Sequence, residues 1–332
     1  MVKRPWGKIV ALCLGLFLFL WIFGQVGLEG TLAQVRQVGW SFPPLLLPSL
    51  LMWVLFSLGW WWTLPPGVSF PNLFLIRTAG EAVNTITPLA YLGGEPLKAS
   101  LLSRLGMPLT DGLASVVVTK TITVFAYCLF IFLGLATALV GTRSSSSALV
   151  GGIGAGLFLA LSVLVLYYSQ KRGLFSYLHR LAYWVGIRGE AWRAKREVLE
   201  ILDAKILSLY RNSKSLSGCL LFSILGWLIS PIETYFFLWA LGTPVDLITT
   251  IVIQALVLGV KAASFFIPAG LGAQEGGNVL IFVALGMSGE VALAFSLLRR
   301  AREVAWILIG LMVLTRYGWG ELKTPPELEP GS

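Results

Sequence analysis

Six ionisable side chains of this 332-residue chain fall within long apolar stretches of sequence, namely Lys120, Arg299, Arg300, Arg302, Glu95 and Glu275. A charge at the centre of a membrane-spanning helix costs at least about 2.5 kcal/mol, so charges in such segments are functional candidates by default. A surplus of cations would bind an anionic headgroup, because the guanidinium fork matches phosphate oxygens. Alternatively, the cations pair with carboxylates, including Glu303 and Glu233, and pin together the two internal repeats described below.

The two glutamates each follow a short run of helix-breaking residues in an otherwise apolar region. Acidic side chains favour helix N-termini, so each could cap a returning half-helix, and each could also be a carboxylate that responds to protons or substrate. We expect these breaks to interrupt helices at mid-segment and to gate a substrate pathway through the protein. The breaking residues are Pro88, Gly93, Gly94, Pro268, Gly270 and Gly272.

The composition places these charges in an integral membrane protein. The chain is 56% hydrophobic and only 12% charged, with a mean hydropathy of +0.81, which excludes most soluble enzymes. The net charge of +9 indicates basic cytoplasmic loops rather than nucleic-acid binding. Three cysteines within apolar runs and a single histidine provide neither a disulfide framework nor a metal site, and we expect no cofactor.

The hydropathy pattern predicts an all-α polytopic protein with about six full spans and two re-entrant helical hairpins. About 20 apolar residues suffice for a span. The predicted spans are 9–24, 45–64, 113–140, 148–168, 216–241 and 291–314. The interrupted regions 70–105 and 249–286 predict the hairpins, because exposed backbone at membrane depth is tolerated only inside protein or beside water.

Basic residues orient this layout. With the N-terminus in the cytoplasm, 18 Lys and Arg fall on the cytoplasmic side, counting Arg77 and Lys98, and three fall outside, counting Lys261. Both termini are therefore predicted to be cytoplasmic. The polar linker 169–215 is too short for an ordinary catalytic domain, and its amphipathic first part suits a helix in the membrane interface. A basic anchor is the simpler interpretation of this linker, and a protein-docking role is the alternative.

A single constant shift in numbering superimposes the two interrupted regions without a gap. The shift aligns Pro88 with Pro268, Glu95 with Glu275, Gly106-Met107 with Gly286-Met287, and Lys120 with Arg300. We interpret the pattern as a duplication within one transmembrane domain, 1–332, with repeats at about 45–140 and 216–314. Three crossings separate the copies, so the second is inverted. Inverted repeats with broken helices are typical of alternating-access transporters.

The sequence also resembles a known family at three motifs: Thr87 to Leu102, Phe266 to Gly276, and Leu298 to Glu303. It resembles the flippase-like transmembrane domain shared with lysylphosphatidylglycerol synthases and, within it, the branch of hopanoid-biosynthesis-associated membrane proteins. The resemblance implies lipid translocation or lipid-linked envelope biogenesis. It does not imply aminoacyl transfer, because no counterpart of the soluble synthase domain follows the last span.

Together these features predict a transporter of flippase type in the bacterial inner membrane. Its partner would be a polar-headed membrane lipid, anionic or hopanoid-related, moved by alternating access. A phosphate-binding loop of the G-x-x-x-x-G-K-[ST] type is absent, which excludes direct ATP drive. Two alternatives stay open. One is an intramembrane transferase with Glu95 or Glu275 as base; the other is a non-transporting accessory of lipid- or hopanoid-biosynthesis enzymes.

Overall fold

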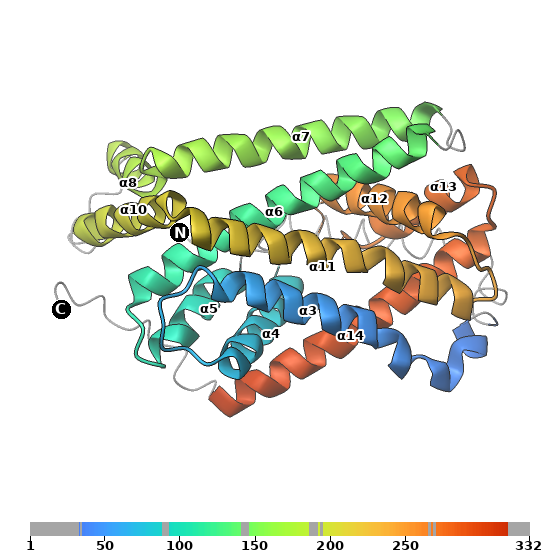
Figure 1. Cartoon of the computed structure of the whole chain (residues 1–332), viewed down its shortest axis with the longest axis horizontal. Coiled ribbons are helices and arrows are strands. Elements are labelled where there is room, and N and C mark those ends of the chain that lie inside the picture. Colours follow the sequence, from blue (N-terminus) through green and yellow to red (C-terminus); the bar gives the residue numbers. More distant parts are fainter. Residues whose placement is uncertain are drawn as a thin grey trace.

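The chain folds into a bundle of helices in a computed structural model (Figure 1). The structure describes residues 33, 35–87, 93–140, 146–185, 192, 195–264, 267 and 270–317. Every regular element in this part of the chain is helical. The elements are η1 Gly39–Ser41, η2 Pro43–Leu46, α3 Leu47–Trp61, α4 Phe70–Ile86, α5 Gly94–Ser103, α6 Leu109–Val140, α7 Ser146–Lys171, α8 Leu174–Trp184, α10 Lys195–Arg211, α11 Ser213–Ala240, α12 Leu247–Ala263, α13 Ala273–Ala284 and α14 Gly289–Tyr317.

The all-α polytopic fold predicted from hydropathy is confirmed. Three described segments are long and apolar enough to cross a membrane: Pro43–Trp61, Leu109–Leu139 and Ser213–Ala240. The predicted spans 148–168 and 291–314 correspond to α7 and α14, and four basic and acidic residues at 299–303 lower the hydropathy of α14. The predicted span 9–24 lies outside the described residues. The number of crossings stays a prediction.

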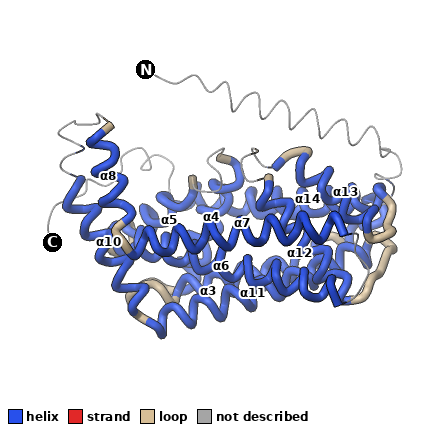
Figure 2. Tube along the Cα trace, turned by 90° about the horizontal axis from the view of Figure 1, so that it is seen from above, coloured by secondary structure: helices blue, strands red, loops and turns tan. Residues whose placement is uncertain are grey.

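Each interrupted region forms two helices joined by a break. In the first region, Asn84 of α4 contacts Gly94, and Glu81 contacts Lys98 further along α5, so the two helices run antiparallel. In the second region, α12 and α13 pack together, as the corresponding helices α4 and α5 do in the first region. The two hairpins occupy opposite halves of the bundle along its long axis (Figures 1 and 2).

The backbone repeats at the offset that the sequence shows. Gly106 and Gly286 both adopt positive φ, and the following methionine amides bond back to Leu102 and Phe282, each five residues earlier. This left-handed glycine cap ends α5 and α13 in the same way. The next helices begin at 109 and 289, which keeps the same offset. The outer limits assigned to the repeats stay a prediction.

Equivalent helices of the two copies pack antiparallel. Phe56 of α3 contacts Trp227 of α11, and the later residue Trp62 lies against the earlier Gly218. Helix α4 packs on α14, and α12 packs on α6, which is the same contact with the copies exchanged. The bundle therefore has an internal two-fold relation between its halves, as an inverted duplication requires.

Helices α8 and α10 of the linker sit at one end of the bundle and are tied to it by buried polar groups (Figure 1). The Tyr210 hydroxyl donates to Gln170 of α7, whose amide in turn bonds Thr121 of α6. Burial raises the pKa of Tyr210 to about 12. Nearby, Lys205 pairs with Asp111 at 2.6 Å.

We predict that Tyr210→Phe destabilises the protein, because it leaves the buried Gln170 oxygen without this donor. The loss should be on the order of 1–2 kcal/mol in the free energy of unfolding, measured by SDS titration in detergent. Tyr168→Phe is the control, since Tyr168 lies largely exposed on α7. Equal stability of the two variants would contradict a structural role for this hydrogen bond.

Candidate functional site

The first charged cluster gathers around the N-terminus of α5. Glu95 accepts from Lys120 of α6 at 2.9 Å and from the Asn84 amide at 2.9 Å. Lys98 bridges two carboxylates, with its Nζ 2.5 Å from Glu81 and 3.1 Å from Glu95. Asn84 also accepts from the Gly94 amide and so caps α5 from α4. The cluster therefore joins α4, α5 and α6.

Two glycines let this cluster form, because α4 and α5 approach closely. A Cβ at Gly94 would lie 1.8 Å from the Gly80 carbonyl oxygen, and a Cβ at Gly80 would lie 2.4 Å from Cγ of Lys98. The lysine stem therefore occupies the space that a side chain at position 80 would need. Lys98 itself is only 4% exposed.

The second charged cluster gathers around the N-terminus of α13. Arg300 of α14 places Nε 2.8 Å from Glu275 and Nη1 2.9 Å from Glu303. The other Glu275 oxygen accepts from the Gly272 amide at 2.7 Å. Glu275 is thus both a cap of α13, one of the two roles predicted for it, and the ion-pair partner of Arg300.

Two further arginines of α14 extend the second cluster towards α11 and α12. Arg302 pairs with the buried Glu233 of α11. Arg299 is buried and donates to the neutral amide oxygen of Gln254 at 3.3 Å, which also accepts from Thr234. Arg299 therefore lies in the core with an uncharged hydrogen-bond partner.

One ion pair recurs at equivalent positions in both clusters. Lys120 with Glu95 and Arg300 with Glu275 are both separated by 25 residues, and the shift that aligns the two repeats carries one pair onto the other. Each pair fastens a short hairpin helix to the long helix that follows it. The pairing prediction is therefore confirmed for these four residues, but the pairs act within each copy and do not pin the two copies to each other.

Three cations that the charge count assigns to one side of the membrane or the other, Arg77, Lys98 and Lys261, lie in the clusters, and the side on which each lies stays a prediction. Lys98 and Arg77 are largely buried, and Arg77 lies 4.0 Å from Glu81. Lys261 interacts electrostatically with Glu303 and the neighbouring arginines. The sequence does not show that these residues join the clusters, because this depends on how α4, α5 and α12 pack in the bundle.

Glu81 is a carboxylate that the sequence patterns did not single out. A signal existed, because Arg77 and Glu81 stand four residues apart on α4 and the shift between the repeats places Glu81 opposite Lys261. The aligned positions therefore carry opposite charges, and the two clusters are not copies of each other.

Among the described residues, each cluster carries one more cation than carboxylate. The first has three cations and two carboxylates, namely Arg77, Lys98, Lys120, Glu81 and Glu95. The second has four cations and three carboxylates, namely Lys261, Arg299, Arg300, Arg302, Glu233, Glu275 and Glu303. Each cluster is therefore suited to an anion, which would balance the excess charge.

The predicted breakers divide into three groups. Gly270 and Gly272 have φ of 60° and 74°, so they need glycine for the turn before α13, as predicted. Gly93 and Gly94 are not conformational breakers, because Gly93 has φ of −65° and both lie at the start of α5. Their role is steric, since a Cβ at Gly93 would meet the Thr87 hydroxyl at 2.2 Å. Pro88 and Pro268 lie outside the described residues.

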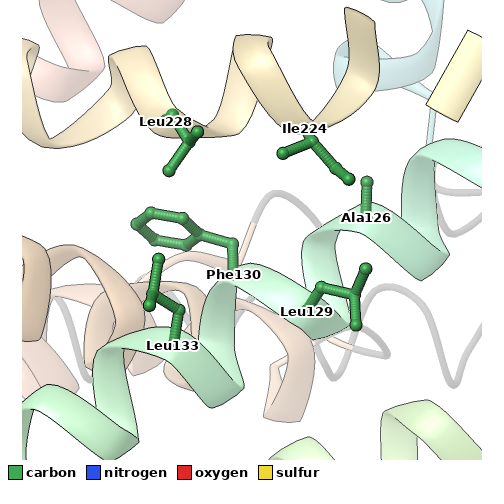
Figure 3. A pocket seen from close by; sticks show the side chains of 6 residues that line it. All are labelled: Ala126, Leu129, Phe130, Leu133, Ile224 and Leu228. Carbon is green, nitrogen blue, oxygen red and sulfur yellow. The ribbon is translucent and has the colours of Figure 1, made fainter. Parts of the chain in front are cut away.

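An apolar groove lies between α6 and α11 (Figure 3). It encloses about 80 Å³ and is lined by Ala126, Leu129, Phe130, Leu133, Ile224 and Leu228. Phe130 forms a buried floor, whereas Leu129, Leu133 and Leu228 are substantially exposed at the rim. In a bilayer such a groove would face lipid tails.

We predict that Glu275→Gln lowers the free energy of unfolding by about 3 kcal/mol, because it leaves Arg300 with one carboxylate fewer in a buried site and weakens the α13 cap. SDS titration in detergent measures the change. Glu200→Gln is the matched control, since its pair with Arg196 is exposed, and we expect no measurable effect there. A neutral outcome at Glu275 would mean that the pair does not anchor α13.

Known proteins resemble this chain over most of its length. Residues 8–310 match the family described as the lysylphosphatidylglycerol synthase TM region. A UPF0104 membrane protein of Pyrococcus horikoshii is 24% identical over 328 residues, which cover 92% of this chain and 96% of that relative. Another, of Methanothermobacter thermautotrophicus, is 26% identical over 250 residues, covering 69% of this chain and 70% of that relative. No solved structure matches. The chain therefore belongs to the lysylphosphatidylglycerol synthase TM-region family and is a multi-pass membrane protein.

Proposed function

We propose that the protein is a lipid transporter of flippase type, in which the two charged clusters receive the lipid headgroup in turn. The observation that carries this proposal is the recurrence of one ion pair, Lys120 with Glu95 and Arg300 with Glu275, in the two antiparallel halves. Transporters built from inverted repeats place their substrate sites between the repeats, near broken helices. The family membership supports a lipid-related role.

The excess charge of each cluster favours an anionic headgroup. A lipid phosphate could exchange with Glu95 at Lys120, or with Glu275 at Arg300, without leaving a buried cation unpaired. The second cluster also keeps hydrogen-bonding capacity, because the buried Arg300 Nη2 and Glu233 Oε1 have no partner among the described residues. Lys120 is more accessible than Arg300, because 32% of the Lys120 side chain is exposed and 21% of the Arg300 side chain is.

The hairpins supply the moving parts of the proposed cycle. Helix α5 is tied to α6, and α13 is tied to α14, by the pairs that the headgroup would replace. Loss of a pair would loosen the short helix at one end of the bundle. Binding of a headgroup at a cluster would therefore favour opening of the bundle at that end. The apolar groove between α6 and α11 would contact a few methylene groups of an acyl chain during passage.

The proposed orientation in the membrane rests on the predicted excess of basic residues on the cytoplasmic side. We place the protein in the bacterial inner membrane with both termini in the cytoplasm, and we propose that it acts as a transporter rather than an enzyme. The energy source would be an ion gradient or the lipid gradient itself. A hopanoid-related lipid stays a secondary substrate proposal, because a near-neutral head would not balance the excess cations.

We predict that Lys120→Ala and Arg300→Ala each slow lipid translocation at least about tenfold in proteoliposomes containing fluorescent phosphatidylglycerol, the loss expected when one charge-assisted contact is removed. Dithionite bleaching measures the fraction of lipid moved between leaflets. Lys120→Arg and Arg300→Lys should keep part of the activity, because the charge is retained. Arg196→Ala, at an exposed pair on α10, is the control.

Three outcomes would redirect the assignment. Undiminished translocation in both alanine variants, with folding verified by gel filtration, would remove the headgroup role of the clusters. A chemically altered lipid in the mass spectrum after incubation would instead favour an intramembrane transferase. Absence of translocation by the parent protein, together with co-purification of a biosynthetic enzyme, would favour an accessory role.

A further inference from the structure

Helix α8 presents an apolar stripe that no other described part of the bundle covers. Tyr177, Leu178, Leu181, Trp184 and Val185 are between 41% and 79% exposed. Their spacing of one, three, three and one residues places all five on one side of the helix. A stripe of this size and aromatic content is unusual on a face exposed to water.

The stripe belongs to a fixed helix rather than to a frayed one. Asp203 of α10 accepts from the amides of Phe175 and Ser176 at 3.2 and 2.8 Å and also from the Ser176 hydroxyl. This carboxylate satisfies the free N–H groups at the start of α8. On the opposite side, His179 is buried, stacks on Trp192 and hydrogen-bonds its carbonyl oxygen. One face of α8 is therefore docked and the other is free.

The position of α8 relative to the spans is also set. Helix α10, which carries α8, is joined to α7 and α6 through Tyr210, Gln170 and Thr121. Helix α8 begins directly after α7, beyond the left-handed Gly173. From residue 157 to residue 168, the outer face of α7 is apolar and exposed, at Leu157, Phe158, Leu161, Leu164, Val165 and Tyr168. Helix α8, with its stripe, lies beside α7 at one end of the bundle (Figure 2).

The charge around the stripe selects among possible partners. Lys171 and Arg172 precede α8, Arg180 flanks the stripe, and all three are exposed, while α8 contains no acidic residue. The whole linker 169–215 holds ten basic and four acidic residues. Aromatic and aliphatic side chains bordered by cations are the composition of helices that lie in the headgroup layer of anionic membranes.

We propose that α8 lies in the interface of the adjacent leaflet and recruits anionic lipids there. The stripe enters the boundary between headgroups and acyl chains, and Lys171, Arg172 and Arg180 contact lipid phosphates. Because α8 packs against α10, its contact with lipid fixes how deeply the end of the bundle nearest the first charged cluster lies in the membrane. The inference concerns a surface separate from the two charged clusters and does not depend on transport.

The test uses the full-length protein with a single reactive cysteine. Trp184→Cys, in a background in which Cys13, Cys128 and Cys219 are replaced by serine or alanine, is labelled with bimane and reconstituted into vesicles. Glu200→Cys, at an exposed position on α10, is the matched control. Fluorescence is quenched by iodide from the aqueous phase, and separately by brominated phosphatidylglycerol or brominated phosphatidylcholine at equal mole fraction.

We expect iodide to quench the label at 184 several-fold less than the label at 200, and brominated phosphatidylglycerol to quench position 184 at least about twice as strongly as brominated phosphatidylcholine. With Lys171, Arg172 and Arg180 all changed to Gln, the ratio of the two lipids should fall to one. Equal iodide quenching at both positions would overturn the interfacial location. Equal quenching by the two lipids in the parent would overturn the anionic preference.

Discussion

A charge inside a membrane bundle must be paired, and the arrangement of this protein follows from that constraint. Lys120 and Arg300 each stand well inside a long helix, where a charge without a partner is costly. Their partners, Glu95 and Glu275, come from the short helices of the two hairpins. The hairpins are therefore held in the bundle by the same contacts that make the long helices tolerable in a bilayer.

Backbone polarity imposes a second constraint on the same hairpins. The short helix of each hairpin begins with peptide N–H groups that no preceding helical turn satisfies, and inside a membrane bundle these groups need partners within the protein. The structure uses side chains for this purpose: Asn84 accepts from the Gly94 amide, and Glu275 accepts from the Gly272 amide. In both halves the capping group also belongs to, or bonds with, the charged cluster. Capping and charge pairing are therefore coupled, so that a change in the ion pairs would also alter the cap of the short helix.

The two halves nevertheless differ where their chemistry would matter most. Position 81 carries a carboxylate, whereas the aligned position 261 carries an ammonium group, and the neutral Thr119 aligns with Arg299. The first cluster is compact, with Lys98 shared between two glutamates. The second is richer in arginine and includes a buried guanidinium bonded to an amide. A common fold thus holds two sites of equal excess charge but unequal composition.

The sequence by itself determined the membrane class, the helical hairpins and the constant offset between the two repeats, because these depend on hydropathy, on glycine and proline, and on local spacing. It also identified Glu95, Glu275, Lys120 and Arg300. Only the tertiary structure decided which carboxylate each cation pairs with, and it brought Glu81 and Lys98 into the first cluster. Their roles arise from the close contact of α4 with α5 across Gly80 and Gly94, and such approach between helices depends on packing that periodicity along one helix does not specify.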